Sequence, residues 1–134
     1  MSAPFLIFGA TGGVGSALAS KLHAKGHPLV LSGRNEEALS RSADQLGATH
    51  VAGDVTHEDD LTHIVEQATT DDGLAGLAFC VGSIDLKPLR RITSDDLTAA
   101  FQLNAVSAAL AIQKAAPALK KAKGSVVLFS TIAV

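Results

Sequence analysis

Residues 5–15 read FLIFGATGGVG, and this stretch decides the fold class. Its first four residues are wholly apolar and end at Gly9, which is typical of a short strand covered by helices on both faces. From residue 13 to residue 25, apolar side chains recur every fourth position, and Gly26 follows as a helix stop. The stretch therefore predicts a strand, a tight glycine turn and a helix in immediate succession.

The rest of the chain alternates in the same way. Further strands are expected at residues 29–31, 49–52, 77–81 and 125–129. Asn35 is expected to cap a second helix that ends at Gly47, and Thr56 to cap a third. A long alanine-rich helix over residues 97–121 is expected to bend near Asn104 and Pro117. This alternation predicts the doubly wound α/β class, with a Rossmann-like parallel sheet and helices on both faces.

Composition narrows the class of protein. The chain has 134 residues, of which 47% are hydrophobic and 18% charged, so we expect a single domain over residues 1–134. A net charge of -2 with mixed signs disfavours nucleic acid and membrane surfaces as partners and favours small molecules. No charged leader precedes the first apolar run, and Cys80 is the single cysteine, so we expect a cytoplasmic protein. Two histidines, His23 and His27, are separated by a predicted helix end, which argues against a metal site.

The glycine loop has the context of a dinucleotide site. Glycines allow a tight turn and a close approach of the backbone to a pyrophosphate, and the helix N-terminus offers free amides and partial positive charge. No lysine followed by serine or threonine completes a P-loop. A purely structural turn and another phosphate ligand are the alternatives. The residues expected to hold the pyrophosphate are Gly9, Thr11, Gly12, Gly13, Val14 and Gly15.

The end of the second strand bears on which dinucleotide binds. An NAD site needs an acidic residue there, whereas this chain has Ser32-Gly33-Arg34-Asn35. A guanidinium pairs well with a 2′-phosphate, so Arg34 and Asn35 predict NADP(H) as the cofactor. The alternative is that Arg34 is a solvated residue before a helix.

These segments resemble the short-chain dehydrogenase/reductase family along essentially the whole chain. The loop is similar to that family's GxxxGxG motif, although Phe8 stands where threonine is usual. Asp54 and Val55 resemble the family's Asp-Val element, which implies contact with adenine; the alternative for Asp54 is a turn residue near Thr56. The family's strand order, 3-2-1-4-5-6-7, implies the order 3-2-1-4-5 here, with the fifth strand at an edge.

The segment after the fourth strand departs from the family pattern. Cys80, Val81 and Gly82 stand where the family has Asn-Ala-Gly, and only the glycine is kept. The resemblance still implies that these three residues lie beside the cofactor. For Cys80, a buried structural thiol is favoured over a reactive one, because no basic residue is near it in sequence.

The reaction site is represented only in part. Asn104 matches the family's helix asparagine that helps to hold a water in the proton relay. Ser130 and Thr131 match the serines after the fifth strand, with Thr131 at the catalytic position. The alternatives are a satisfied polar group at a helix kink for Asn104 and ordinary strand-end hydroxyls for Ser130 and Thr131.

The family's Tyr-x-x-x-Lys pair is missing, because the sequence contains no tyrosine. The resemblance implies an oxidoreductase that exchanges hydride with a carbonyl or alcohol substrate, and we expect this chain alone to be inactive. The alternative function is a non-catalytic NADP(H)-sensing regulator similar to NmrA-like proteins. The apolar fifth strand would be left as an edge, so we expect a homo-oligomer or association with a C-terminal half that this sequence lacks.

Overall fold

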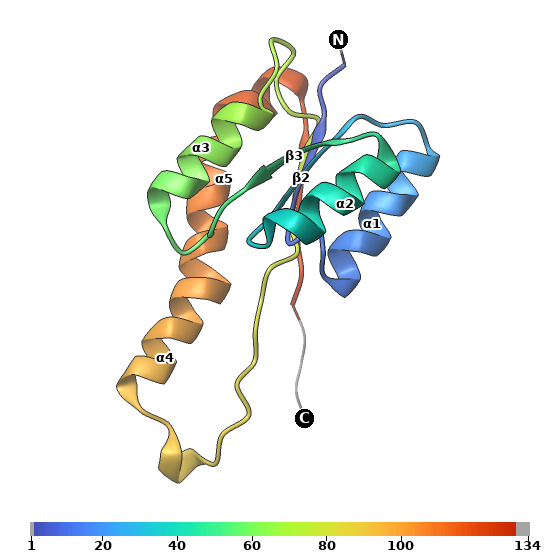
Figure 1. The fold of residues 1–134 in the computed structure, drawn as a ribbon. Helices are drawn as coiled ribbons and strands as arrows, with labels where there is room; N and C mark the ends of the chain where they lie inside the picture. The colour runs from blue at the N-terminus through green and yellow to red at the C-terminus, as the bar shows by residue number, and fades with distance from the viewer. Residues whose placement is uncertain (1, 131–134) are drawn as a thin grey trace.

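The computed structural model describes residues 2–130 and contains one parallel sheet between two layers of helices (Figure 1). Its strand order is β3-β2-β1-β4-β5 and every pairing is parallel, which confirms the predicted class and order. The strands are β1 (Phe5–Phe8), β2 (Leu29–Gly33), β3 (Thr49–Ala52), β4 (Gly76–Phe79) and β5 (Ser125–Leu128). β4 ends two residues and β5 one residue before the predicted end.

The alternation of side chains along β1 divides the interior into two cores. Leu6 and Phe8 belong to a core beneath α3 (Glu58–Ala68) and α5 (Ser107–Ala122). Ile7 points to the opposite face and packs in a second core with residues of α1 (Gly13–Ala24) and α2 (Glu36–Leu46). All three side chains are completely buried. A wholly apolar strand is therefore explained by helices on both of its faces.

The ends of α2 follow the sequence prediction. The side-chain oxygen of Asn35 accepts a hydrogen bond from the amide of Ala38 at 3.0 Å, so Asn35 is the N-cap. Gly47 ends the helix with φ 59°, in the left-handed region that glycine adopts without strain.

The predicted cap of α3 is wrong. The helix begins at Glu58 with His57 in the N-cap position, and the Thr56 hydroxyl instead donates to Oδ1 of Asp54 at 2.7 Å. The acidic residues of the first turn, 58–60, interact favourably with the helix dipole. Thr56 lies one residue before the N-cap, in a turn where its amide and its hydroxyl both donate to Asp54.

The long helical segment begins in the polar stretch just before residue 97 and contains one irregular turn. Thr93 and Asp96 form a capping box at the start of α4 (Ser94–Phe101). A π-helical turn, Gln102–Val106, then joins α4 to α5 at the place where a bend near Asn104 was expected. No break occurs at Pro117, because α5 continues through it with the proline on the exposed side.

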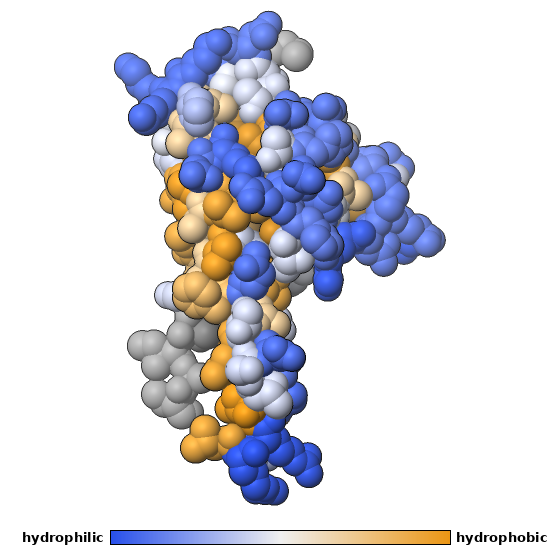
Figure 2. Space-filling view, turned by 90° about the vertical axis from the view of Figure 1, so that its left-hand side faces the viewer, coloured by the Kyte–Doolittle hydropathy of each residue, from blue (hydrophilic) through white to orange (hydrophobic). Residues whose placement is uncertain are grey.

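Two surfaces leave apolar side chains exposed. β5 lies at the sheet edge, where Val127 is 47% and Leu128 53% exposed, as expected for an uncovered edge strand. On α4, Leu97 and Phe101 are also exposed. Figure 2 shows a band of hydrophobic residues running down the face formed by the long helical segment. Within residues 2–130, no helix combines the length and the hydropathy needed to cross a bilayer.

Candidate functional site

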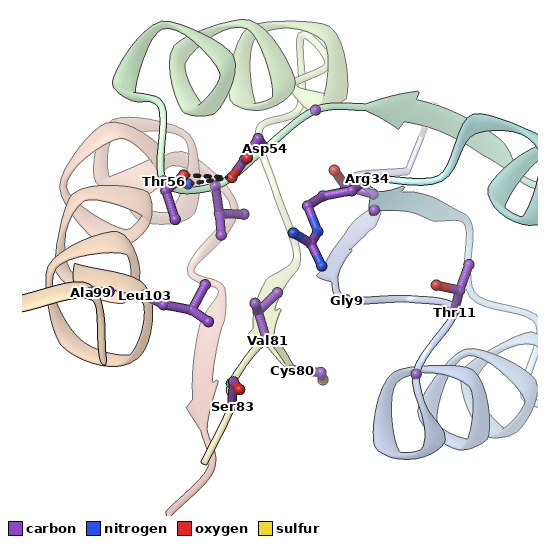
Figure 3. A pocket seen from close by; sticks show the side chains of 16 residues that line it. Gly9, Thr11, Arg34, Asp54, Thr56, Cys80, Val81, Ser83, Ala99 and Leu103 are labelled. Carbon is purple, nitrogen blue, oxygen red and sulfur yellow. Dashed lines mark hydrogen bonds between the residues drawn. The ribbon is translucent and has the colours of Figure 1, made fainter. Parts of the chain in front are cut away.

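The carboxyl ends of the strands meet a cavity of about 550 Å³. The loops after β1, β2, β3 and β4 all contribute to it, and the α4 end of the helical segment closes one side (Figures 1 and 3). This is the edge at which ligands bind in doubly wound folds. The lining residues are Gly9, Thr11, Gly12, Ser32, Gly33, Arg34, Gly53, Asp54, Val55, Thr56, Cys80, Val81, Gly82, Ser83, Ala99 and Leu103.

Glycine is required at two positions of the first loop. Gly9 has φ 73°, and a Cβ on it would lie 2.6 Å from the carbonyl oxygen of Cys80. A Cβ on Gly15 would collide with the carbonyl oxygen of Gly9, so this glycine allows α1 to approach the loop closely. Gly15 is buried and lies outside the cavity lining; its role is in packing the helix against the loop.

The start of α1 faces the cavity with main-chain groups. Its N-cap is Gly12, which has no side chain to accept from the first-turn amides. Those amides remain available to an anion, together with the positive end of the helix dipole. Thr11 and Gly12 line the cavity, whereas Gly13 does not and would have open space around a Cβ. Val14 is 52% exposed and lines a neighbouring cavity.

Arg34 extends into the cavity, and Figure 3 shows its guanidinium between Asp54 and Gly9. Within residues 2–130, it makes no hydrogen bond or ion pair with another protein group. Its cationic head is therefore available to an anionic ligand. Asn35 lies outside the cavity lining, because its side chain caps α2.

Asp54 is both a cavity residue and a turn residue. Its Oδ1 accepts hydrogen bonds from the Thr56 hydroxyl at 2.7 Å and from the Thr56 amide at 2.9 Å. These bonds lower the pKa of Asp54 below its ordinary value, and the charges of His57 and Arg34 act in the same direction. The carboxylate is thus ionised and held at the wall of the cavity, with Val55 buried behind it.

Cys80, Val81 and Gly82 line both the first cavity and a second one of about 750 Å³. The Cys80 thiol is partly buried, and burial raises its pKa, which keeps it in the unreactive thiol form at neutral pH. The chain after β4 thus forms a wall between the two cavities.

The second cavity brings together two of the predicted reaction-site residues, Asn104 and Ser130. Val14, Asn104 and Ser130 line it together with apolar residues of β5 and its end. Asn104 holds the wall in place, because its side chain bonds both main-chain polar atoms of Ser83. Thr131, the predicted catalytic hydroxyl, lies outside the described residues.

Several lining residues escaped the sequence prediction. Ser32 and Gly33 directly precede Arg34, and this position next to a predicted site residue could have indicated that they line the cavity. Ala99 and Leu103 reach the cavity only because the helical segment packs over it, and no pattern in their own sequence indicates this.

The site fits an anionic dinucleotide cofactor on three counts. Added Cβ atoms would clash at Gly9 and Gly15, the first-turn amides of α1 after Gly12 have no side-chain cap, and an unpaired guanidinium extends into the cavity at Arg34. The volume of about 550 Å³ lies within the usual range of cofactor sites.

Comparison with known proteins agrees with this arrangement. A family model described as enoyl-(acyl carrier protein) reductase matches residues 9–134. An uncharacterized oxidoreductase of Staphylococcus aureus (strain MW2) is 28% identical over 134 residues, covering 95% of this chain and 57% of its own length. The dehydrogenase/reductase SDR family member 7B of Bos taurus is 44% identical over 57 residues, covering 42% of this chain and 18% of its own.

Solved structures show the same fold. A short-chain dehydrogenase/reductase from Brucella melitensis, titled glucose/ribitol dehydrogenase, superposes with a TM-score of 0.90 at 27% identity, over 97% of this chain and 56% of that one. An alcohol dehydrogenase from the archaeon Thermococcus sibiricus, complexed with 5-hydroxy-NADP, gives a TM-score of 0.87 at 18% identity, over 95% and 57%. The chain thus spans little more than half the length of these proteins. With a family model matching nearly all of it, the chain belongs to the short-chain dehydrogenase/reductase family of oxidoreductases.

Proposed function

We propose that this chain is the NADP(H)-binding part of an oxidoreductase that transfers hydride between nicotinamide and a carbonyl or alcohol substrate. The observation that carries the proposal is the unpaired guanidinium of Arg34, which faces the glycine loop across the cavity. A 2′-phosphate is the part of NADP(H) that such a cation recognises. That the Thermococcus sibiricus relative was solved with an NADP derivative supports this choice.

Each wall of the cavity has a proposed role. The first-turn amides of α1, which follow Gly12, and the backbone of Gly9 bind pyrophosphate, and Arg34 binds the 2′-phosphate. Asp54 and Val55 bind the adenine. When bound, the nicotinamide supplies or accepts the hydride.

The wall and the second cavity bind the reacting half. Cys80, Val81 and Gly82 border both cavities, so the nicotinamide end would pass along them and meet a substrate in the second cavity, where Asn104 and Ser130 are polar lining residues. A general acid of the tyrosine type is not among these residues, because the sequence has none. We therefore propose that this chain alone binds cofactor without turning over a substrate.

Cofactor titration tests the proposal. Calorimetry should show that NADPH binds more tightly than NADH. Arg34→Ala should lower the affinity for NADPH at least tenfold and change the affinity for NADH little. Arg41→Ala is the matched control, because Arg41 is an exposed arginine of α2 that pairs with Glu37. Equal affinity of the wild type for NADH and NADPH would contradict the NADP(H) preference, and absence of binding would contradict the proposal as a whole.

A further inference from the structure

Ser32 is a buried hydroxyl with no protein partner at the edge of the cavity. Its side chain is 1% exposed, and within residues 2–130 its Oγ is the one buried side-chain polar atom without a hydrogen bond. A buried group of this kind is destabilising unless something accepts or donates to it. In the same structure, the other buried serine, Ser107, donates to the carbonyl oxygen of Gln102 at 2.8 Å.

The position of Ser32 in β2 makes the hydroxyl unexpected. Side chains two residues apart share a face of the strand, so Ser32 lies on the face of Val30. Its register partners are Phe8 in β1 and Val51 in β3, both of which pack in the core beneath α3 and α5. Ser32 thus ends an otherwise apolar row, and the residue belongs to the lining of the cavity.

The main chain of Ser32 is hydrogen-bonded to the glycine loop of the site. Its carbonyl oxygen accepts a hydrogen bond from the amide of Ala10 at 3.0 Å, which fixes the glycine loop beside β2. Gly33 and Arg34 follow directly, and all three line the cavity on the side of Asp54 and Val55. This is the side at which the proposed function places the adenosine half of the dinucleotide.

We infer that Ser32 is a further binding residue, whose hydroxyl completes its hydrogen bonding with the adenosine half of the bound dinucleotide, directly or through one ordered water. The inference rests on the proposed function. The hydroxyl of Ser32 has no protein partner in the free protein, so its hydrogen bond would form only when the dinucleotide binds. The opposite holds for Ser107, whose partner is present without ligand.

The test compares Ser32→Ala with Ser107→Ala. For each variant, calorimetry gives the Kd of NADPH and of 2′,5′-ADP, which carries only the adenosine half, and thermal unfolding gives the stability of the free protein. Ser32→Ala should raise both Kd values by the same factor, roughly three- to tenfold, with an unfolding midpoint unchanged or raised. Ser107→Ala should lower the midpoint and leave both Kd values unchanged.

The possible failures are distinguishable. Wild-type affinity in Ser32→Ala overturns the role of Ser32 and leaves the proposed function intact. A lowered midpoint or loss of folding in Ser32→Ala also overturns it, since the hydroxyl would then be structural. If the wild type prefers NADH, the NADP(H) preference fails, and NADH with 5′-ADP replaces the two ligands in the same comparison. Absence of any nucleotide binding overturns the inference together with the proposed function.

Discussion

The carboxamide of Asn104 bonds both main-chain polar atoms of Ser83: its Oδ1 accepts from the Ser83 amide at 3.0 Å and its Nδ2 donates to the Ser83 carbonyl at 3.0 Å. The same Nδ2 donates to the carbonyl oxygen of Ala100 at 3.0 Å. One side chain at the π-helical turn thus attaches the segment after β4 to the helical layer. The wall between the two cavities depends on this attachment.

Asn104→Ala should detach that wall. We expect a loss of about 1–2 kcal/mol in the free energy of unfolding, because both main-chain groups of Ser83 and the carbonyl oxygen of Ala100 lose this partner. Urea denaturation measures this loss, and hydrogen exchange should show faster exchange at the Ser83 amide. Asn35→Ala is the control, since loss of the α2 cap costs about 1 kcal/mol and leaves Ser83 protected. Unchanged protection of Ser83 in Asn104→Ala would contradict the attachment.

Gly15→Ala should disrupt the glycine loop. The new methyl would collide with the carbonyl oxygen of Gly9, so α1 must move away from the loop, with loss of both stability and nucleotide affinity. Gly13→Ala is the matched control, because a Cβ there meets nothing within 4 Å and alanine is the better helix former. We expect Gly13→Ala to raise stability by about 0.5–1 kcal/mol. Equal effects of the two substitutions in thermal unfolding would refute this distinction.

Thr56→Val should change how stability depends on pH. Thr56 lowers the pKa of Asp54 below the ordinary 3.8, so the folded state binds a proton at this group less readily than the unfolded state does. The resulting stabilisation is fully present above the unfolded pKa and is lost as the pH falls through the folded pKa. Valine removes the hydroxyl and keeps the amide bond, so part of this stabilisation should disappear.

The comparison of Thr56→Val with the wild type is made by urea denaturation across the acid range. The difference in unfolding free energy should be largest at neutral pH and should shrink as Asp54 becomes protonated. Thr62→Val is the control, because the Thr62 hydroxyl donates to a main-chain carbonyl, which does not titrate. A pH-independent difference for Thr56→Val would show that its hydroxyl does not act through the carboxylate.

Lys123→Gly should stabilise the end of α5. Lys123 is the C-cap with φ 54°, and among residues 2–130 it is the one non-glycine residue with positive φ. Glycine adopts this conformation without strain, so we expect a gain of about 0.5–1 kcal/mol. Lys120→Gly should instead lower stability, because it places glycine within the last helical turn. Thermal unfolding of both variants checks the two signs.

Features encoded by neighbours in the sequence could be predicted, and features created by distant contacts could not. The apolar run of β1, the cap at Asn35 and the stop at Gly47 each depend on a few adjacent residues. The failure at Thr56 has a different origin. A turn at Asp54 holds Thr56, and the helix begins only at Glu58, so Thr56 lies one residue before the N-cap. The sequence indicated Asn104 as a relay residue or as a satisfied polar group at a helix kink, but it did not show that its partner is Ser83, 21 residues away.

In the candidate site, too, features that depend on adjacent residues could be predicted, and features that depend on distant contacts could not. The glycine loop and Arg34 could be predicted because their chemistry depends on residue type and on their place at a strand end. The unpaired state of Ser32 was not predictable, because it depends on which groups of β1 and β3 flank it.

Cys80 is a site for attaching a single spectroscopic label. It is the single cysteine of the chain and it borders both cavities, so a thiol-directed fluorophore or spin label would report from the dividing wall without background. Its raised pKa means that labelling needs alkaline buffer. Protection of this thiol by a ligand would reveal occupancy of either chamber, even when no reaction takes place.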